Sequence, residues 1–343
     1  MANDTIQEIV IAGAGSVGCY AGGTLALAGR DVTLLLRPAL AETLSTKGFN
    51  VRDFRGIQHY VPPTQLKLAI DPAIAFQKAA VILVTVKSLA TAEMAELIAN
   101  HAPASADVIS LQNGAGNANV LRKRLGQDRS VVAGMVPFNV MQLRGTGQAP
   151  LFLRATSGTI QIETGNAHLC SLLNVPGLPV TESANMQSVL WSKLVINLNN
   201  AINALAGVPL SQELQDRHWR LIVARQMDEA LATLKAAGIK TAAIEGIKPA
   251  LMAKALRLPT PLFRLAAASF LSIDPQARSS MWDDLERCRM TEIDYLQGAI
   301  LRLAEKTGVQ TPLTRRIVEL IKQAEKTTLG SPRLDPSDID AGV

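Results

Sequence analysis

Residues 191–205 predict a helix whose polar side chains suit a binding site better than a solvated surface. At 100° per residue, Lys193, Asn197 and Asn200 lie within about 60° of one another, apart from a leucine and isoleucine stripe. Four of the seven residues 197–203 are asparagine, which disfavours a helix because its side chain competes for the backbone. We infer a polar site for a ligand on this face, and a solvated polar face is the plainer alternative.

A glycine-rich loop near the N-terminus provides the chemistry to bind a phosphate. Residues 9–12 predict a buried strand, and they are followed by Gly13, Ala14, Gly15, Ser16, Val17 and Gly18 and then by a helix to about residue 28. Glycines at these spacings allow a tight turn, a close backbone approach to a pyrophosphate and close helix packing. Because N–H groups and the helix dipole favour an anion there, we predict a dinucleotide site. A glycine-rich turn without a ligand is the alternative.

The end of the second predicted strand bears on which dinucleotide binds. NAD-binding units place an Asp or Glu about 20 residues after the glycines, where it bonds the ribose 2′-hydroxyl. Here the strand 32–36 ends at Arg37, with no acidic residue beside it. An arginine pairs with a 2′-phosphate, whereas a carboxylate would repel one. We therefore predict NADP(H), with a solvated strand-end charge as the alternative for Arg37.

Two further polar residues follow predicted strands. Lys87 comes directly after the apolar run 79–86, and Asn113 follows the run 107–111. In parallel sheets covered by helices, ligands bind beyond the carboxyl ends of the strands. Both side chains are therefore expected near the ligand.

The elements that must position these residues are of two kinds. Residues 1–183 alternate short strands with helices, which predicts an α/β domain with a Rossmann-type, mostly parallel sheet that binds NADP(H). Within it, residues 49–70 contain a weaker β pair and residues 151–163 a late strand pair. Residues 184–330 show helical periodicity only, which predicts an all-helical substrate and catalytic domain.

The expected helices of the second domain cover residues 186–206, 215–237, 242–256, 281–306 and 312–326. Pro259, Pro261 and Pro275 indicate a loop-rich insertion. The polar, aperiodic residues 331–343 are expected to form a mobile tail.

Composition excludes several classes of protein. The 343 residues are 48% hydrophobic and 18% charged, which is typical of a globular chain with two domains. A net charge of +5 and 4% aromatic residues argue against a nucleic-acid partner. The three cysteines are far apart, so we expect neither disulfides nor a metal site. With no signal peptide or apolar run of membrane length, we expect a cytoplasmic monomer or homodimer without membrane contact.

A second constellation lies at residues 278–295. Ser280 and Asp283 resemble a capping box, so Ser280 either caps a helix or faces an anionic group of the substrate. Glu292 lies more than three turns further along the same expected helix, where a solvated carboxylate is the default interpretation.

The chain from residue 8 to about 327 resembles the ketopantoate reductase (2-dehydropantoate 2-reductase) family. The resemblance is carried, in order, by the glycine loop, Arg37, residues 84–87, 112–114, 190–194 with Asn197, 279–281 and 291–295. It implies a Rossmann domain followed by a helical domain, and NADPH-dependent reduction of ketopantoate in pantothenate synthesis. It also implies that the nicotinamide and the 2-oxo acid meet in a cleft between the domains.

The resemblance implies roles for individual residues. Lys193 would be the general acid, and Glu292 would bond the substrate hydroxyl. The implied substrate contacts are Asn113, Asn197, Asn200 and Ser280. The implied cofactor contacts are Gly13, Ala14, Gly15, Ser16, Val17, Gly18, Arg37, Lys87, Asn113 and Glu292.

The expected mechanism follows from charge flow. A hydride that reaches a ketone carbon leaves negative charge on the oxygen, which must be stabilised and protonated. A lysine ammonium, with an ordinary pKa of about 10.4, becomes a better acid when it is buried. A nearby carboxylate such as Glu292 opposes that effect.

Two departures from some relatives concern the substrate contacts. Ala201 stands where they carry a second asparagine, with Asn200 just before it, and Ala277 stands where they carry another. A reductase of a different branched 2-oxo acid is therefore an alternative. A non-catalytic NADP(H)-sensing protein is the alternative from another functional class.

Overall fold

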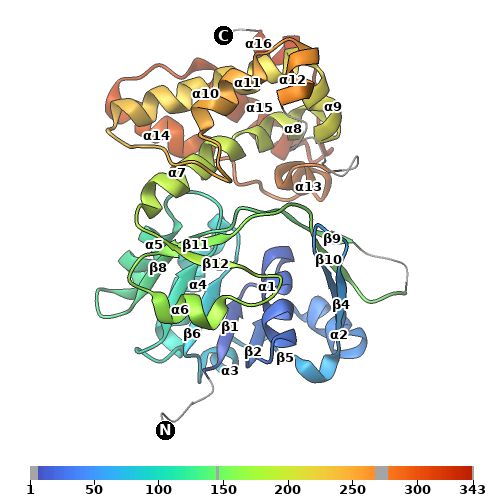
Figure 1. Cartoon of the computed structure of the whole chain (residues 1–343), viewed down its shortest axis with the longest axis vertical. Coiled ribbons are helices and arrows are strands. Elements are labelled where there is room, and N and C mark those ends of the chain that lie inside the picture. The colour runs from blue at the N-terminus through green and yellow to red at the C-terminus, as the bar shows by residue number, and fades with distance from the viewer. Residues whose placement is uncertain (1–6, 144–146, 267–276, 342–343) are drawn as a thin grey trace. The chain divides into compact units, whose positions relative to one another are not determined.

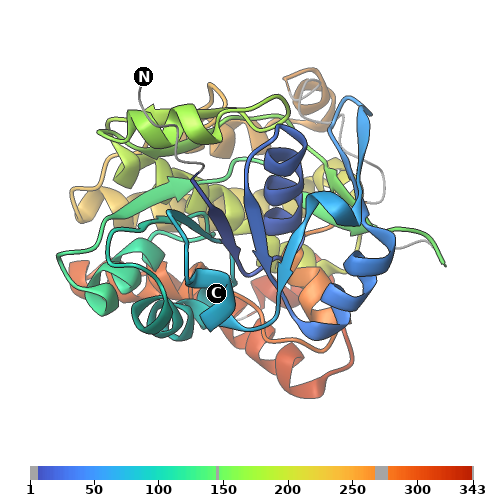
Figure 2. The same ribbon diagram turned by 90° about the horizontal axis from the view of Figure 1, so that it is seen from below.

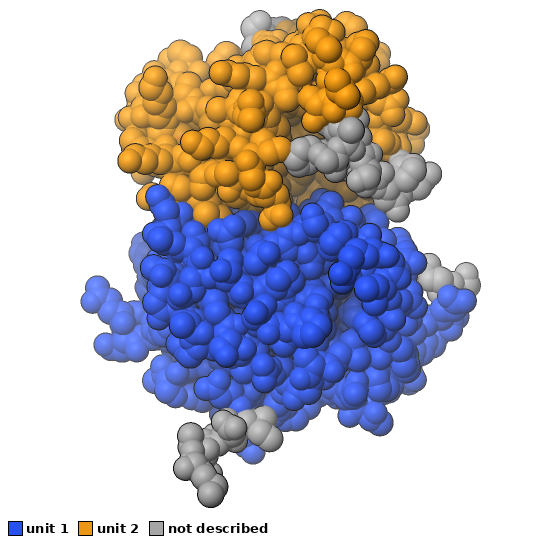
Figure 3. All heavy atoms as spheres, viewed as in Figure 1, with its two compact units in different colours: residues 1–186 blue, residues 187–343 orange. Residues whose placement is uncertain are grey.

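The computed structural model describes residues 7–143, 147–266 and 277–341 (Figure 1). The chain divides into two compact units, residues 1–186 and residues 187–343 (Figure 3).

Unit 1 is built on an eight-stranded sheet with the strand order β12-β11-β8-β7-β6-β1-β2-β5. Its strands are β1 (Ile9–Ala12), β2 (Val32–Leu35), β5 (Lys67–Ala69), β6 (Val81–Val84), β7 (Asp107–Ser110), β8 (Val131–Met135), β11 (Ile160–Glu163) and β12 (Val180–Ser183). All neighbours pair in parallel except β8 and β11, which are antiparallel. This confirms the predicted mostly parallel, Rossmann-type sheet.

Helices cover both faces of this sheet (Figures 1 and 2). Ile9 and Ile11 of β1 pack into one core with α1 (Ser16–Leu27) and α6 (Ala167–Leu173). Val10 and Ala12 pack into a second core, with helices α3 (Pro72–Phe76), α4 (Thr91–His101) and α5 (Asn117–Leu125). Because both faces are buried, the strand is apolar at every position rather than at alternate ones.

A second, four-stranded sheet in unit 1 has the order β4-β3-β10-β9. It consists of β3 (Phe49–Arg52), β4 (Gln58–Val61), β9 (Val140–Leu143) and β10 (Leu151–Arg154), with helix α2 (Pro38–Lys47) preceding β3 in the chain. The predicted pair around residues 49–61 is confirmed, since β3 and β4 are antiparallel neighbours. The late pair expected at residues 151–163 is wrong, because β10 belongs to this sheet and β11 to the larger one.

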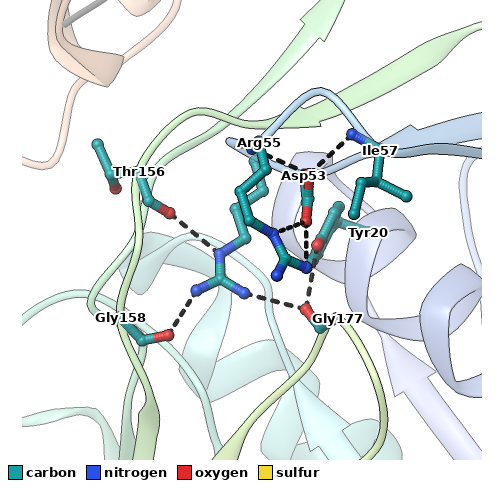
Figure 4. A network of polar contacts seen from close by, with 8 residues as sticks. Tyr20, Asp53, Arg55, Ile57, Thr156, Gly158 and Gly177 are labelled. Atoms are coloured by element: carbon teal, nitrogen blue, oxygen red, sulfur yellow. Dashed lines mark hydrogen bonds and ion pairs between the residues drawn. The ribbon is translucent and has the colours of Figure 1, made fainter. Parts of the chain in front are cut away.

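A buried arginine holds the chain where it changes sheets (Figure 4). Arg154 is 3% exposed and donates to the carbonyl oxygens of Thr156 at 3.0 Å, Gly158 at 2.5 Å and Gly177 at 3.0 Å. Its guanidinium also lies 4.2 Å from the centroid of the Phe138 ring. These bonds satisfy three carbonyl groups and link the segment after β10 to the connection before β12.

The described part of unit 2 consists of helices joined by loops, which confirms the expected helical character. The helices are α7 (Met186–Asn197), whose first residue ends unit 1, α8 (Asn199–Ala206), α9 (Leu210–Gln215), α10 (Arg217–Ala236), α11 (Pro249–Leu256), α12 (Thr260–Ala266), α13 (Ser280–Glu286), α14 (Gln297–Thr307), α15 (Pro312–Thr327) and α16 (Pro336–Asp340). Part of the expected loop-rich insertion is helix α12, and Pro275 lies outside the described residues. Of the described helices, none combines the length and the apolar character needed to cross a bilayer.

Two of the helices expected in unit 2 are interrupted. The first breaks at Leu198, whose carbonyl accepts a hydrogen bond of 2.8 Å from the Gln297 side chain. The second ends after α13, where Cys288 has a φ of 49° and the Arg289 N–H donates to the Asp284 carbonyl at 2.8 Å. A left-handed residue with such a backward bond is a common helix terminator, so residues 287–296 form a connection rather than a helix.

The expected mobile tail is instead a folded segment up to residue 341. The Leu334 N–H donates to the Leu205 carbonyl at 2.9 Å, and Asp340 pairs with Arg225 of α10. Ile339 of α16 is fully buried. A single apolar residue among polar ones produces no periodic signal, so the sequence analysis did not detect this helix.

Candidate active site

The glycine loop in unit 1 has the conformation that its residue types require. Gly13 has a φ of +93°, and a Cβ there would lie 2.2 Å from Val86 Cγ1. A Cβ on Gly18 would lie 2.6 Å from Thr85 Oγ1, so α1 can pack closely only with glycine there. At Gly15, by contrast, a Cβ would approach no atom more closely than 4.0 Å. Gly15, which directly precedes α1, therefore leaves room for a phosphate near the helix N-terminus.

The predicted cofactor residues of unit 1 lie along one edge of the sheet. Strands β7, β6, β1 and β2 are consecutive in the sheet and mutually parallel. Asn113, Lys87, the glycine loop and Arg37 follow their respective carboxyl ends. The structure thus brings these residues to the same edge, with Arg37 and Lys87 exposed and Asn113 partly buried.

A buried polar network fixes the turn that contains Asn113. The Asn113 carbonyl accepts hydrogen bonds from Ser88 Oγ at 3.1 Å and from Asn117 Nδ2 at 2.5 Å. Gln112 Nε2 donates to the Val86 carbonyl at 3.0 Å, which ties the end of β7 to the end of β6. Local sequence patterns do not reveal Gln112 and Asn117 as supports, because Gln112 bonds Val86 at a separation of 26 residues and Asn117 bonds Ser88 at a separation of 29.

Lys193 lies on α7 in unit 2 and is partly buried. Burial lowers the pKa of Lys193 from 10.5 to about 8, while the charge of Glu245 acts in the opposite direction. Glu245 lies in the connection between α10 and α11, with a φ of 46°. No local sequence pattern links this carboxylate to a lysine about 50 residues earlier, so it is not among the residues predicted from the sequence.

The asparagines after Lys193 have more than one function. Leu198, the single residue between α7 and α8, keeps helical backbone angles (φ −58°, ψ −28°), so Asn200 follows Lys193 and Asn197 along nearly the same helical path. Asn203 is fully buried, accepts from the Ser279 N–H at 2.9 Å and donates to the Val208 carbonyl at 2.9 Å and to Glu213 Oε2 at 2.5 Å. Part of the asparagine enrichment therefore serves the internal framework of unit 2.

The residue that caps α13 is Ser279, and the expected capping box of Ser280 with Asp283 is wrong. Ser279 Oγ accepts from the Trp282 N–H at 3.1 Å and donates to the Asn200 carbonyl at 2.9 Å. Asp283 pairs with Arg278 at 2.5 Å. Ser280 is the exposed first residue of the helix, so its hydroxyl is not used by the cap.

Glu292 is neither helical nor solvated, which corrects two expectations. It lies in the connection between α13 and α14 and is 9% exposed. Its carbonyl accepts hydrogen bonds of 3.0 Å from both the Tyr295 and Leu296 N–H groups. Within the described residues, no group of three or more His, Cys, Asp and Glu side chains could hold a metal ion.

Glu213, a buried carboxyl that accepts a hydrogen bond from Asn203, should make the stability of unit 2 depend on pH. Burial raises the pKa of Glu213 from 4.5 to about 7, although hydrogen bonds from Asn203 and Asn199 oppose the shift. The folded state therefore binds this proton more tightly than the unfolded state. As pH rises from 4.5 to 7, we expect this one group to lower the free energy of unfolding by up to about 3 kcal/mol.

Glu213→Gln should remove that pH dependence, because the amide cannot ionise and its oxygen can still accept from Asn203. All three tryptophans, Trp191, Trp219 and Trp282, lie in unit 2, so their fluorescence reports its chemical unfolding. Glu319→Gln, at an exposed position on α15, is the control and should keep the wild-type pH dependence. If the free energy of unfolding changed with pH in the same way in the wild type and in Glu213→Gln, the raised pKa assigned to Glu213 would be wrong.

Comparisons with known proteins agree along both units. Residues 9–166 match the family model described as ketopantoate reductase PanE/ApbA, and residues 185–325 match that described as ketopantoate reductase PanE/ApbA C terminal. The 2-dehydropantoate 2-reductase of Archaeoglobus fulgidus is 25% identical over 327 residues, which is 93% of this chain and 98% of the relative.

Solved structures show the same fold. A PanE/ApbA family ketopantoate reductase from Ralstonia eutropha JMP134 superposes with a TM-score of 0.77 at 30% identity, covering 94% of this chain and 99% of the other. A D-mandelate dehydrogenase in a ternary structure with NADH and anilino(oxo)acetate superposes with a TM-score of 0.76 at 21% identity, covering 94% and 99% of the two chains. The second likeness concerns the fold alone.

Proposed function

Because the chain belongs to the ketopantoate reductase family of oxidoreductases, we propose that it reduces 2-dehydropantoate to pantoate with NADPH, in pantothenate biosynthesis. The observation that carries this proposal is that both family models match this chain. The ketopantoate reductase model matches residues 9–166, and the model of the C-terminal part matches residues 185–325. The relatives named 2-dehydropantoate 2-reductase support the same reaction over nearly their whole length.

We assign cofactor binding to the Rossmann-type domain predicted over residues 1–183, which lies within unit 1. The space at Gly15 and the start of α1 fit a pyrophosphate, and the exposed Arg37 and Lys87 are cations at the same sheet edge. Gly13, Ala14, Ser16, Val17, Gly18 and Asn113 are the other proposed cofactor contacts in unit 1, and Glu292 of unit 2 is a further one. When bound, the nicotinamide supplies the hydride that the ketone carbon receives.

We assign substrate binding and proton transfer to the helical domain predicted over residues 184–330, nearly all of which belongs to unit 2. Lys193 donates its proton to the ketone oxygen as negative charge develops there, and it becomes a neutral amine. A pKa of about 8 keeps most Lys193 side chains protonated at neutral pH while making them better acids than an ordinary lysine. Glu292 orients the substrate through its hydroxyl, Ser280 binds the substrate carboxylate, and Asn113, Asn197 and Asn200 provide further contacts.

The choice of cofactor is tested at Arg37. Arg37→Ala should raise the Kd of NADPH about 10-fold to 100-fold, since a hydrogen bond to a charged group contributes about 1.5–3 kcal/mol. NADH lacks the 2′-phosphate, so its Kd should change less than threefold in the same variant. Fluorescence titration with both cofactors measures the two values. Equal losses for NADPH and NADH, or no loss, would exclude a 2′-phosphate contact.

The reaction itself is tested by the loss of NADPH absorbance with ketopantoate and with a panel of other 2-oxo acids. We expect the highest kcat/KM with ketopantoate. Faster turnover of another branched 2-oxo acid would identify that acid, and not ketopantoate, as the substrate. No turnover with any of them would favour an NADP(H)-sensing protein.

We further propose that the protein acts in the cytoplasm as a monomer or homodimer. Cys19, Cys170 and Cys288 are free thiols, as expected in a reducing compartment. Sedimentation velocity distinguishes the two assembly states.

A further inference from the structure

The connection that contains Glu292 is not itself helical. Residues 287–296 lie between α13 and α14, and Glu292 is nevertheless 9% exposed. A carboxylate that must meet a substrate hydroxyl needs a defined position, because a displacement of about 1 Å can cost about 100-fold in rate. The supports of this connection therefore bear directly on the proposed reaction.

One support is a carboxylate of α15. Glu325 Oε1 accepts hydrogen bonds from the Thr291 N–H at 2.9 Å and from Thr291 Oγ1 at 2.7 Å. Thr291 Oγ1 in turn accepts from the Ile293 N–H at 3.2 Å. The residues on both sides of Glu292 are thus attached, directly or through one hydroxyl, to a single carboxylate.

The same turn of α15 makes a second attachment. Lys322 Nζ lies 2.5 Å from Asp294 Oδ2 and 3.4 Å from Glu325 Oε2. The Glu325 side chain is 4% exposed, so solvent screens its bonds only weakly. Neighbouring residues of α15, Ile321 and Ala324, are buried, which anchors this turn of the helix.

We propose that Glu325 and Thr291 are a pair of positioning residues that hold Glu292 in the orientation needed to bind the substrate hydroxyl. The proposal rests on the function proposed above. It predicts that breaking the Glu325–Thr291 contact impairs catalysis beyond what the accompanying loss of stability explains.

The chain contains a matched contact at the other end of α15. Glu229 Oε1 accepts from the Leu313 N–H at 2.9 Å, and Glu229 Oε2 accepts from the Thr314 N–H at 2.8 Å and from Thr314 Oγ1 at 2.7 Å. Thr314 is fully buried, as Thr291 nearly is at 2% exposure. This pair has the same chemistry but adjoins none of the proposed site residues, so Thr314→Val is a control for Thr291→Val.

The experiment compares Thr291→Val, Thr291→Ser and Thr314→Val by tryptophan fluorescence during chemical unfolding and by steady-state kinetics. We expect both valine variants to be destabilised to a similar degree. Only Thr291→Val should lose kcat, by at least tenfold, and Thr291→Ser should restore it to within threefold of the wild type. Equal kcat in the two valine variants, or a serine variant no better than Thr291→Val, would overturn the positioning role.

A second variant tests the partner carboxylate. Glu325→Leu should lower kcat as Thr291→Val does, and the double variant should lose no more than either alone, because both break one contact. If the loss of kcat in the double variant equalled the product of the two single losses, the two residues would not act through one contact.

The parallel variant Glu292→Gln separates failure of this proposal from failure of the proposed function. Wild-type activity in Glu292→Gln would remove the role of Glu292, and the positioning role would fall with it. A loss in Glu292→Gln with equal kcat in Thr291→Val and Thr314→Val would overturn the positioning role alone.

Discussion

Lys193→Ala is expected to lower kcat for ketopantoate reduction by a factor of about 100 to 10,000, the usual contribution of a positioned general acid. The ketone oxygen would lose both its proton donor and the positive charge that stabilises it. The Kd of NADPH should stay within threefold of the wild type, because Lys193 is not among the proposed cofactor contacts. Stopped-flow absorbance of NADPH measures the rate, and fluorescence titration measures the Kd.

Lys193→Arg is the matched control for charge alone. Arginine keeps a positive charge, but its pKa above about 12 makes it a poor proton donor, so we expect a loss of at least tenfold. Near-wild-type kcat in Lys193→Ala, with NADPH still bound, would show that another group protonates the oxygen.

The pH dependence provides a further check on Lys193. Reduction needs the protonated amine, so kcat should fall as pH rises above about 8, by about tenfold per unit. Glu245→Gln removes a charge that raises the pKa of Lys193, and the fall should then begin at lower pH. A profile that stays flat to pH 10, or a Glu245→Gln profile shifted to higher pH, would contradict this assignment.

Glu292→Gln is expected to lower kcat/KM for ketopantoate about 10-fold to 100-fold. The carboxylate would accept a hydrogen bond from the substrate hydroxyl, and bonds to charged groups contribute about 1.5–3 kcal/mol. Glutamine has nearly the same shape, and the Tyr295 and Leu296 N–H groups bond the backbone carbonyl, so the connection should keep its structure.

The control for this substitution is Glu319→Gln, which removes the same charge from an exposed position on α15. It should keep the wild-type kcat/KM for ketopantoate. Equal kcat/KM in the two glutamine variants would exclude Glu292 from the reaction.

Short-range patterns predicted most of the fold. The apolar run of β1, the glycines and the start of α1 are consecutive in the chain, and each follows rules that act over a few residues. The parallel sheet follows from the same alternation, since strands separated by helices pair in parallel. These elements matched because the residues that specify each of them lie close together in the chain.

The exceptions lie where side chains bond across long separations. The expected helix 186–206 is interrupted at Leu198, whose carbonyl accepts a hydrogen bond from Gln297, 99 positions away. Ser279, not Ser280, caps α13, and its N–H is held by Asn203 at a separation of 76. No local pattern distinguishes two adjacent serines, so the partner in the tertiary structure decided which one caps the helix.

The sequence by itself determined that unit 1 has a glycine loop on a parallel sheet, and that Arg37, Lys87 and Asn113 follow the carboxyl ends of strands. Only the tertiary structure decided that Glu292 is buried in a connection and that Glu325 accepts a hydrogen bond from the adjacent Thr291. It also decided that the charge of Glu245 affects the pKa of Lys193. The physical reason is the separation along the chain between the groups that interact. Backbone conformation is set mainly by nearby residues, whereas burial and the pKa of a side chain depend on groups brought together only by folding.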